Sequence, residues 1–117
     1  MQINGTELHN GITAVWVTDD TELDTDAELL RYPVCSLHTK RAVAIVARWR
    51  ESPGQTVVLT YNADIISCLK PDEVMLVNGG KAAYLSQFED INSWLGGVTC
   101  GELLLWDEEM LIKELKL

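Results

Sequence analysis

Two short apolar segments in the middle of the chain restrict the fold more than any other feature. Residues 55–61 read QTVVLTY and residues 73–77 read EVMLV, and neither alternates between apolar and polar side chains. Such segments are typical of strands covered on both faces, as in parallel sheets. The ADIISCL between them is long enough for a short helix, which Lys70-Pro71 ends. We therefore predict an α/β fold, with a small, partly parallel sheet flanked by helices.

An amphipathic helix is predicted directly before the first of these strands. Within residues 39–51, apolar side chains recur at helical spacing at Ala42, Ile45, Val46 and Trp49. Ser52-Pro53-Gly54 ends this helix. We expect its apolar face, including Trp49, to pack in the core.

Two more helices are predicted towards the C-terminus. Residues 87–95 (QFEDINSWL) are followed by Gly96-Gly97, and we expect Trp94 on their apolar face to be buried. The tail WDEEMLIKELK has acids in its first turn and lysines in its last, as the helix dipole favours. The last fifteen residues of the chain (103–117) are apolar almost all round. They either pack centrally or leave a docking face exposed, and both alternatives stay open.

The N-terminal part is predicted to form a β-hairpin region followed by an acidic loop. Asn4-Gly5 and Asn10-Gly11 are typical of tight hairpin turns, so strands are expected over 1–3, 6–8 and 12–18. Residues 19–26 are expected to form a loop. The spacing of Thr25 and Glu28 is that of a capping box, which predicts a short helix over 26–31 before Pro33.

Length and composition indicate one ordinary globular domain. The chain has 117 residues, of which 47% are hydrophobic, and its longest apolar run is far shorter than the ~20 residues that a membrane span needs. The N-terminus lacks the basic and apolar regions of a secretory signal, so we expect a cytoplasmic protein. The cysteines Cys35, Cys68 and Cys100 have no metal-ligand spacing and are expected to be free thiols. We predict no metal and no cofactor.

The negative charge is concentrated in one segment. The net charge is −9, and residues 1–30 contain seven acids and no lysine or arginine. Most of these acids belong to DDTELDTDAE, which begins at Asp19. Such a surface repels phosphate backbones and argues against direct nucleic-acid binding. It is either a solvated loop or a surface that faces a basic partner.

From about Leu29 to Asp107 the chain resembles the C-terminal lobe of ABC-type ATPases of the SMC/RecF-like and overcoming-lysogenization-defect groups. SLHTKRAVAIVARWRES is similar to the exit of the family's D-loop and the helix after it. The family's switch strand, the helix after it and the next strand resemble QTVVLTYNADIISCLKPDEVMLV in this chain. Its closing element resembles WLGGVTCGELLLW. The segment GITAVWVTDDTELDTDAELL is similar to its first strand and phosphate loop. The resemblance implies a partner ATPase and a role in prokaryotic antiphage defence.

The residues that the family uses for hydrolysis are absent from the matching positions. VTDDTELDTDAE has six acids but no glycine or lysine, so it cannot cradle a triphosphate. The acidic pair that binds Mg²⁺ in the family would fall at Arg31 and Tyr32. The family's switch histidine would fall near Tyr61 and Asn62. The resemblance therefore implies a pseudo-ATPase lobe. We divide this single domain into a hairpin region with the acidic loop (1–28), an ATPase-lobe-like core (29–107) and a C-terminal helix (107–117).

Three other motifs have simpler interpretations. NGGKAAY (78–84) lacks the complete pattern of a phosphate loop, and a hairpin turn explains it. Ser36 and His38 have no nearby acid to orient the imidazole, so we interpret them as loop residues. Asp107, Glu108 and Glu109 are interpreted as acids at a helix start rather than as a metal site.

We therefore predict a non-enzymatic module that binds a protein partner, either an ATPase subunit or a second copy. The alternative is a small acidic inhibitor or immunity protein that blocks a basic, nucleic-acid-binding site on its partner. We expect neither nucleic acid nor membrane as a direct partner, and we expect an oligomer or a heteromer. The predicted partner-binding residues are Asp19, Asp20, Glu22, Asp24, Asp26, Tyr61, Asn62, Asp64, Trp106, Met110, Leu111 and Leu115.

Overall fold

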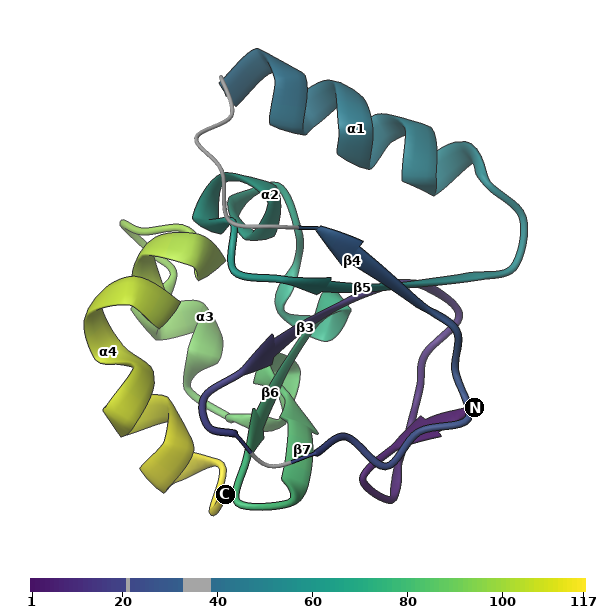
Figure 1. Ribbon diagram of the computed structural model, residues 1–117. Coiled ribbons are helices and arrows are strands. Elements are labelled where there is room, and N and C mark those ends of the chain that lie inside the picture. Colours follow the sequence, from purple (N-terminus) through teal and green to yellow (C-terminus); the bar gives the residue numbers. More distant parts are fainter. Residues whose placement is uncertain (21, 33–38) are drawn as a thin grey trace.

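A computed structural model of the chain describes residues 1–20, 22–32 and 39–117. It has the predicted α/β fold (Figure 1). The chain forms the strands β1 (Gln2–Ile3), β2 (Thr6–Glu7), β3 (Gly11–Val17), β4 (Leu29–Tyr32), β5 (Gln55–Thr60), β6 (Val74–Asn78) and β7 (Lys81–Tyr84). It also forms the helices α1 (Thr39–Glu51), α2 (Ala63–Ser67), α3 (Ile91–Trp94) and α4 (Cys100–Glu114) and the 3-10 turns η1 (Pro71–Glu73) and η2 (Leu85–Gln87).

The main sheet has the strand order β4-β5-β3-β6-β7. The first four of these strands run parallel, and β7 pairs antiparallel with β6. The two apolar segments form β5 and β6, as predicted, and β3 lies between them. Gly79 and Gly80 have positive φ angles (59° and 78°) and form the tight β6–β7 turn, which confirms the hairpin interpretation of NGGKAAY.

Helices α1, α2, α3 and α4 lie on one face of the sheet. The larger core cluster combines β3 and β6 side chains with those of α1, α2 and α4, among them Ile12, Leu76, Val46, Ile66 and Leu103. In α1 the predicted apolar face is confirmed, because Ala42 and Val46 are buried and Trp49 packs against this cluster.

The opposite face of the sheet is covered by the N-terminal hairpin and the loop after β3. Ile3, Leu8 and Val57 belong to a second core cluster on this face, and Leu23 packs against it. The Asn4-Gly5 turn joins β1 to β2, as predicted. The prediction of a second hairpin turn at Asn10-Gly11 is wrong, because Gly11 begins β3 with a φ of 88°. In Figure 1 this hairpin and α4 lie on opposite sides of the sheet.

The predicted helix over 26–31 is wrong, because residues 29–32 form strand β4. Leu29 pairs with Val57 of β5, and parallel pairing continues along the strand. The Thr25 hydroxyl donates to the Gln2 carbonyl at 2.6 Å and accepts from the Ala27 N–H, so it fixes the loop to β1 instead of capping a helix. Strand pairing at the sheet edge therefore overrides a local capping signal.

The predicted helix over 87–95 is also mostly wrong. Only Ile91–Trp94 form α3, after the separate 3-10 turn η2. Trp94 is 44% exposed, although it was expected in the core. So short a helix presents little of its surface to the sheet, and Ile91 and Phe88 fill the core there instead.

Helix α4 begins earlier than predicted and is broken at Asp107. Thr99 caps its N-terminus, since its side chain accepts from the Glu102 N–H and the Glu102 carboxylate accepts from the Thr99 N–H. Asp107 has the non-helical angles φ −130° and ψ 30°, so a second helical segment starts there. The acids 107–109 thus stand at the start of a segment, as their sequence indicated.

Two of the three cysteines lie in described parts of the structure. Both are free thiols, Cys68 half-buried and Cys100 buried. Burial raises the pKa of the Cys100 thiol to about 11. Cys35 lies outside the described residues, as do Pro33, Ser36 and His38. Within the described ranges, no helix has the length and apolar character needed to cross a bilayer.

An ion pair between α1 and η1 makes stability depend on pH. Arg50 donates to both carboxylate oxygens of Glu73, at 2.6 and 2.8 Å, and the Lys70 N–H donates to Glu73 as well. Burial alone would raise the pKa of Glu73, but these hydrogen bonds outweigh it and lower the pKa below its usual value. The ion pair therefore stabilises the protein fully at pH values above the ordinary carboxyl pKa. This stabilisation is lost as pH falls through the lowered pKa of Glu73 in the folded protein.

We expect Glu73→Gln to lower the free energy of unfolding by about 1 kcal/mol at pH 7. The difference from the wild type should shrink towards zero as pH falls through the lowered pKa of Glu73, because both proteins then have an uncharged side chain there. Denaturant unfolding at several pH values measures this. The exposed Glu51→Gln is the control, and a Glu73→Gln difference that stays constant with pH would contradict the assignment.

Candidate protein-binding surface

The carboxyl ends of the parallel strands meet at one edge of the sheet. Open α/β sheets commonly bind their ligands just outside this edge. Here β3 is followed by the acidic loop, β5 by Tyr61 and Asn62, and β6 by the Gly79-Gly80 turn. The topology therefore brings together three polar segments that are far apart in the sequence.

The start of the acidic loop is bound to the β6–β7 turn. Asp19 Oδ2 accepts from the Gly79 N–H at 2.8 Å, and the Thr18 hydroxyl lies 2.7 Å from Asn78 Oδ1. The turn amide that a phosphate could approach is therefore bound to a carboxylate. This arrangement opposes anion binding at the glycine turn.

An aromatic pair connects this edge to the break in α4. Trp16, the penultimate residue of β3, donates from Nε1 to Glu108 Oε2 at 2.7 Å. Its ring meets that of Tyr61 edge-on, with centroids 5.4 Å apart. Burial, followed by the negative charges of Glu108, Asp20 and Asp19, raises the pKa of the Tyr61 hydroxyl. These carboxylates, two from the acidic loop and one from α4, thus act on one aromatic side chain.

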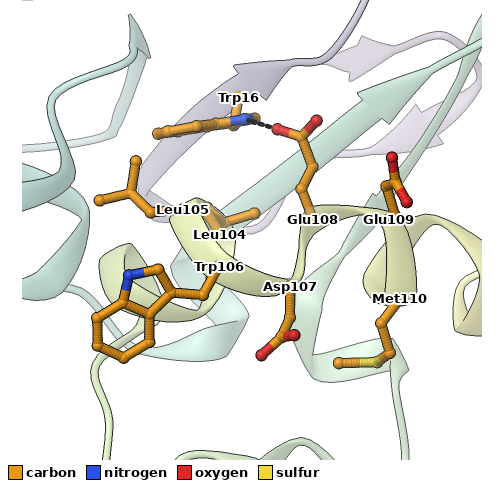
Figure 2. Close-up of a pocket in the computed structure, with 8 residues that line it drawn as sticks. All are labelled: Trp16, Leu104, Leu105, Trp106, Asp107, Glu108, Glu109 and Met110. Atoms are coloured by element: carbon orange, nitrogen blue, oxygen red, sulfur yellow. Dashed lines mark hydrogen bonds between the residues drawn. The ribbon is translucent and has the colours of Figure 1, made fainter.

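A groove of about 620 Å³ follows the broken part of α4 (Figure 2). It is lined by Trp16 and by seven consecutive helix residues, Leu104, Leu105, Trp106, Asp107, Glu108, Glu109 and Met110. Leu105 is 58% exposed and Trp106 65% exposed. The lining has three carboxylates and no cationic side chain. We call this surface the α4 groove; it combines exposed apolar groups with negative charge.

A second groove, of about 380 Å³, lies on the helix-free face of the sheet. Its walls combine the apolar side chains of Val17, Leu23, Leu29 and Leu59 with the polar ones of Glu22, Thr25 and Arg31. Tyr61 also lines it, so this residue stands between the second groove and the Trp16 ring of the α4 groove.

Six of the predicted partner-binding residues lie around these two grooves. Asp19, Asp20 and Tyr61 are exposed at the carboxyl edge. The other three line a groove: Trp106 and Met110 line the α4 groove, and Glu22 lines the second groove together with Tyr61.

The remaining predicted residues lie elsewhere or are buried. Asp26 accepts from the Gln2 N–H, and the backbone of Asp24 is bound to Asn4, so both belong to the hairpin side. Asp64 is exposed in the first turn of α2. Leu115 lies at the far end of α4, beside Phe88 and Glu89.

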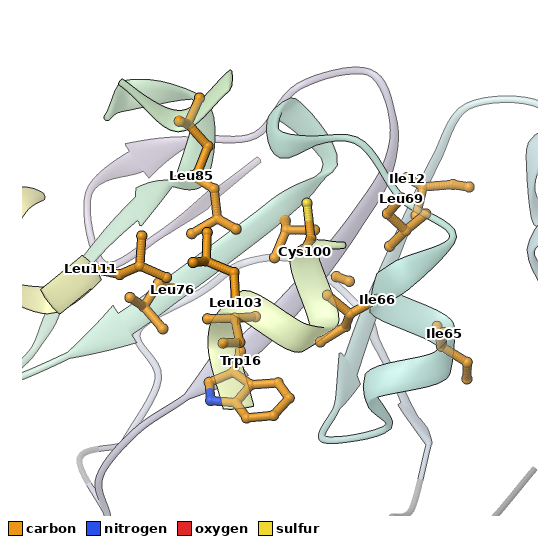
Figure 3. Close-up of a cluster of buried hydrophobic side chains, with 14 of the residues drawn as sticks. Ile12, Trp16, Ile65, Ile66, Leu69, Leu76, Leu85, Cys100, Leu103 and Leu111 are labelled. Atoms are coloured by element: carbon orange, nitrogen blue, oxygen red, sulfur yellow. The ribbon is translucent and has the colours of Figure 1, made fainter. Parts of the chain in front are cut away.

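Asn62 and Leu111 have structural positions, which corrects their assignment to a binding surface. Asn62 is 4% exposed, and its side-chain oxygen accepts from the Asp64 and Ile65 N–H groups at the start of α2. Leu111 is completely buried with Leu76 and Leu85 (Figure 3). In a tail that is apolar on all sides, the sequence cannot show which residues are buried and which are exposed.

The sequence did not single out Leu105 or Glu108 as binding residues. Both lie beside the break at Asp107, and only the long-range bond from Trp16 gives Glu108 its orientation. The signal available in the sequence was the change from LLLW to DEEM at residues 103–110, which marks a boundary between apolar and acidic groups.

The surface offers little for metal chemistry. Within residues 1–20, 22–32 and 39–117, no three histidine, cysteine or acidic side chains are grouped as metal ligands. At the carboxyl end of β4, where the resemblance places an acidic pair, Arg31 is a cation and cannot bind Mg²⁺. What the surface can do is present aromatic and aliphatic groups within a negative field.

A comparison of the chain with protein-family models, with curated proteins and with solved structures found no match. The resemblance to an ATPase lobe therefore stays a prediction from the sequence motifs.

Proposed function

We propose that this protein is a non-enzymatic module that binds another protein through the carboxyl edge of its sheet and the α4 groove. The observation that carries the proposal is the pair Leu105 and Trp106, two adjacent, mostly exposed apolar side chains on a groove lined by carboxylates. Large aromatic side chains beside apolar neighbours are typical of the residues that dominate binding energy at interfaces.

The distribution of charge favours a protein with a basic surface as the partner. Asp19, Asp20 and Glu108 act on the same tyrosine, and the whole chain has a net charge of −9. Like charges disfavour contact with nucleic acid, and they disfavour pairing of two copies through this face. A basic partner is attracted instead, and its association should weaken as salt increases.

The resemblance to an ATPase lobe makes an ATPase subunit our first candidate for the partner, with antiphage defence as the setting. A lobe that has acids in place of the phosphate loop cannot bind ATP there, but it still has the surface through which it could pair with an ATPase subunit. The alternative, an acidic inhibitor that blocks a nucleic-acid-binding site, uses the same surface. Competition by DNA or RNA for the captured partner distinguishes the two, because only the inhibitor occupies the nucleic-acid site.

Capture with matched variants tests this function. Wild type, Leu105→Ala/Trp106→Ala and Trp94→Ala are immobilised and exposed to a lysate of the source organism. Trp94 is also an exposed tryptophan, 44% accessible, but it lies outside both grooves. We expect wild type and Trp94→Ala to retain the same protein, and the double variant to lose at least about nine tenths of it.

A thermal-stability measurement with ATP and Mg²⁺ completes the test. We expect no stabilisation, because the loop after β3 is acidic and has no lysine. Clear stabilisation by ATP, or equal capture by the double variant and the wild type, would overturn the proposal.

A further inference from the structure

The α4 groove combines features that suit one kind of side chain from a partner protein. This inference rests on the proposed function. Glu108 is half-buried and held by the Trp16 indole at 2.7 Å through Oε2. Figure 2 shows this carboxylate beside Glu109, whereas Leu105 and Trp106 precede it in α4 and the Trp106 ring points to the other side of the helix. The groove therefore offers an oriented carboxylate, an added negative charge and an aromatic surface.

A guanidinium group matches the oriented carboxylate and the added negative charge, and the groups beside it in a peptide can reach the aromatic surface. It is planar, remains charged at all physiological pH values, pairs with carboxylates through two N–H groups and stacks on aromatic rings. An ammonium group satisfies the charge but neither the paired geometry nor the stacking. Leu105 and Met110 provide apolar contacts for the aliphatic part of an arginine or for a neighbouring apolar residue.

Other occupants fit the groove less well. A second copy would bring its own acids against Asp107, Glu108 and Glu109, and a nucleic acid or an anionic membrane would bring phosphates. The orienting bond from a nearly buried tryptophan, 7% exposed, also shows that Glu108 is not a freely moving surface acid. Charge complementarity therefore points to a basic protein segment.

We propose that the α4 groove binds an arginine-containing segment of a partner protein, with the guanidinium on Glu108 and the apolar neighbours of that arginine on Leu105 and Trp106. The partner is then recognised by a short basic-apolar motif as well as by its overall charge.

Titration with a short peptide tests this inference directly. The probe is the capped peptide Ala-Leu-Arg-Leu-Arg-Ala, added to the ¹⁵N-labelled full chain at low salt. We expect the indole N–H resonance of Trp106 to shift and that of Trp94 to stay unchanged, with both resonances assigned through Trp→Phe variants. Peptides with lysine or glutamine in place of arginine should bind more weakly, the glutamine peptide least of all.

Glu108→Gln provides the decisive variant, because its amide oxygen still accepts from the Trp16 indole while the negative charge is lost. We expect it to weaken binding of the arginine peptide about tenfold. Glu89→Gln removes the same charge at an exposed position outside the α4 groove and should change binding less than about twofold.

Equal binding of the arginine and glutamine peptides, or an unchanged affinity of Glu108→Gln, would overturn the inference. The proposed function would still stand if Leu105→Ala/Trp106→Ala lost the captured protein. If the double variant lost neither the peptide nor the protein, both proposals would fail.

Discussion

Gly101→Ala is expected to destabilise the protein by about 2 kcal/mol or more, which lowers the melting temperature by roughly 8 °C. A β-carbon on Gly101 would lie 2.2 Å from the Ala63 carbonyl oxygen and 2.3 Å from Ser67 Oγ. The first of these atoms belongs to the backbone of α2, so α2 and α4 would have to separate. The cost exceeds the gain of about 1 kcal/mol that alanine normally brings to a helix interior.

Gly97→Ala is the matched control for this prediction. Apart from its chain neighbours, no atom of the described residues lies within 4 Å of the β-carbon it would introduce, and its melting temperature should be unchanged or slightly higher. Thermal unfolding followed by circular dichroism measures both variants. A Gly101→Ala protein as stable as the wild type would mean that α2 and α4 do not pack this closely.

The second large effect is expected from Leu111→Ala, which should lower the free energy of unfolding by about 2–5 kcal/mol. Leu111 is completely buried between the sheet and α4, among the side chains drawn in Figure 3. Its removal leaves a cavity that the surrounding side chains fill only partly.

Leu105→Ala makes the same chemical change in the same helix at a position that is 58% exposed. It should alter the free energy of unfolding by no more than about 0.5 kcal/mol. We expect it to weaken partner capture instead. Urea unfolding of the two variants compares them directly. Equal losses of stability would show that Leu105 is also part of the core and does not belong to a binding surface.

Much of the architecture could be predicted because its signals are local. The unbroken apolar runs of β5 and β6 indicated buried parallel strands, and the spacing of Ala42 and Val46 indicated the buried side of α1. The Asn4-Gly5 and Gly79-Gly80 turns have the positive φ angles that their sequences favour. In each case the residues within the element are sufficient to indicate its structure.

The errors in the prediction arose where distant parts of the chain decide local structure. Residues 29–32 become a strand because β5 offers them a partner, although their sequence allowed a helix. Trp94 stays exposed because α3 is only one turn long.

The binding surface was predicted only in part for the same reason. Tyr61, Asp19 and Trp106 were singled out one by one, but the sequence had no means of relating them to each other. Their relation depends on strand order and on the Trp16–Glu108 bond, which spans 92 positions. The sequence also assigned Leu111 to the surface, because burial along an apolar helix depends on which side faces the sheet.

By itself the sequence determined the α/β class, the acidic character of the chain and the absence of a glycine-rich, lysine-containing loop after β3. These properties follow from composition and local patterns. Only the tertiary structure decided that the acids of the loop, Tyr61 and the broken helix α4 share one edge. The physical reason is that parallel strands align their carboxyl ends, and this alignment gathers the loops that follow strands far apart in the chain.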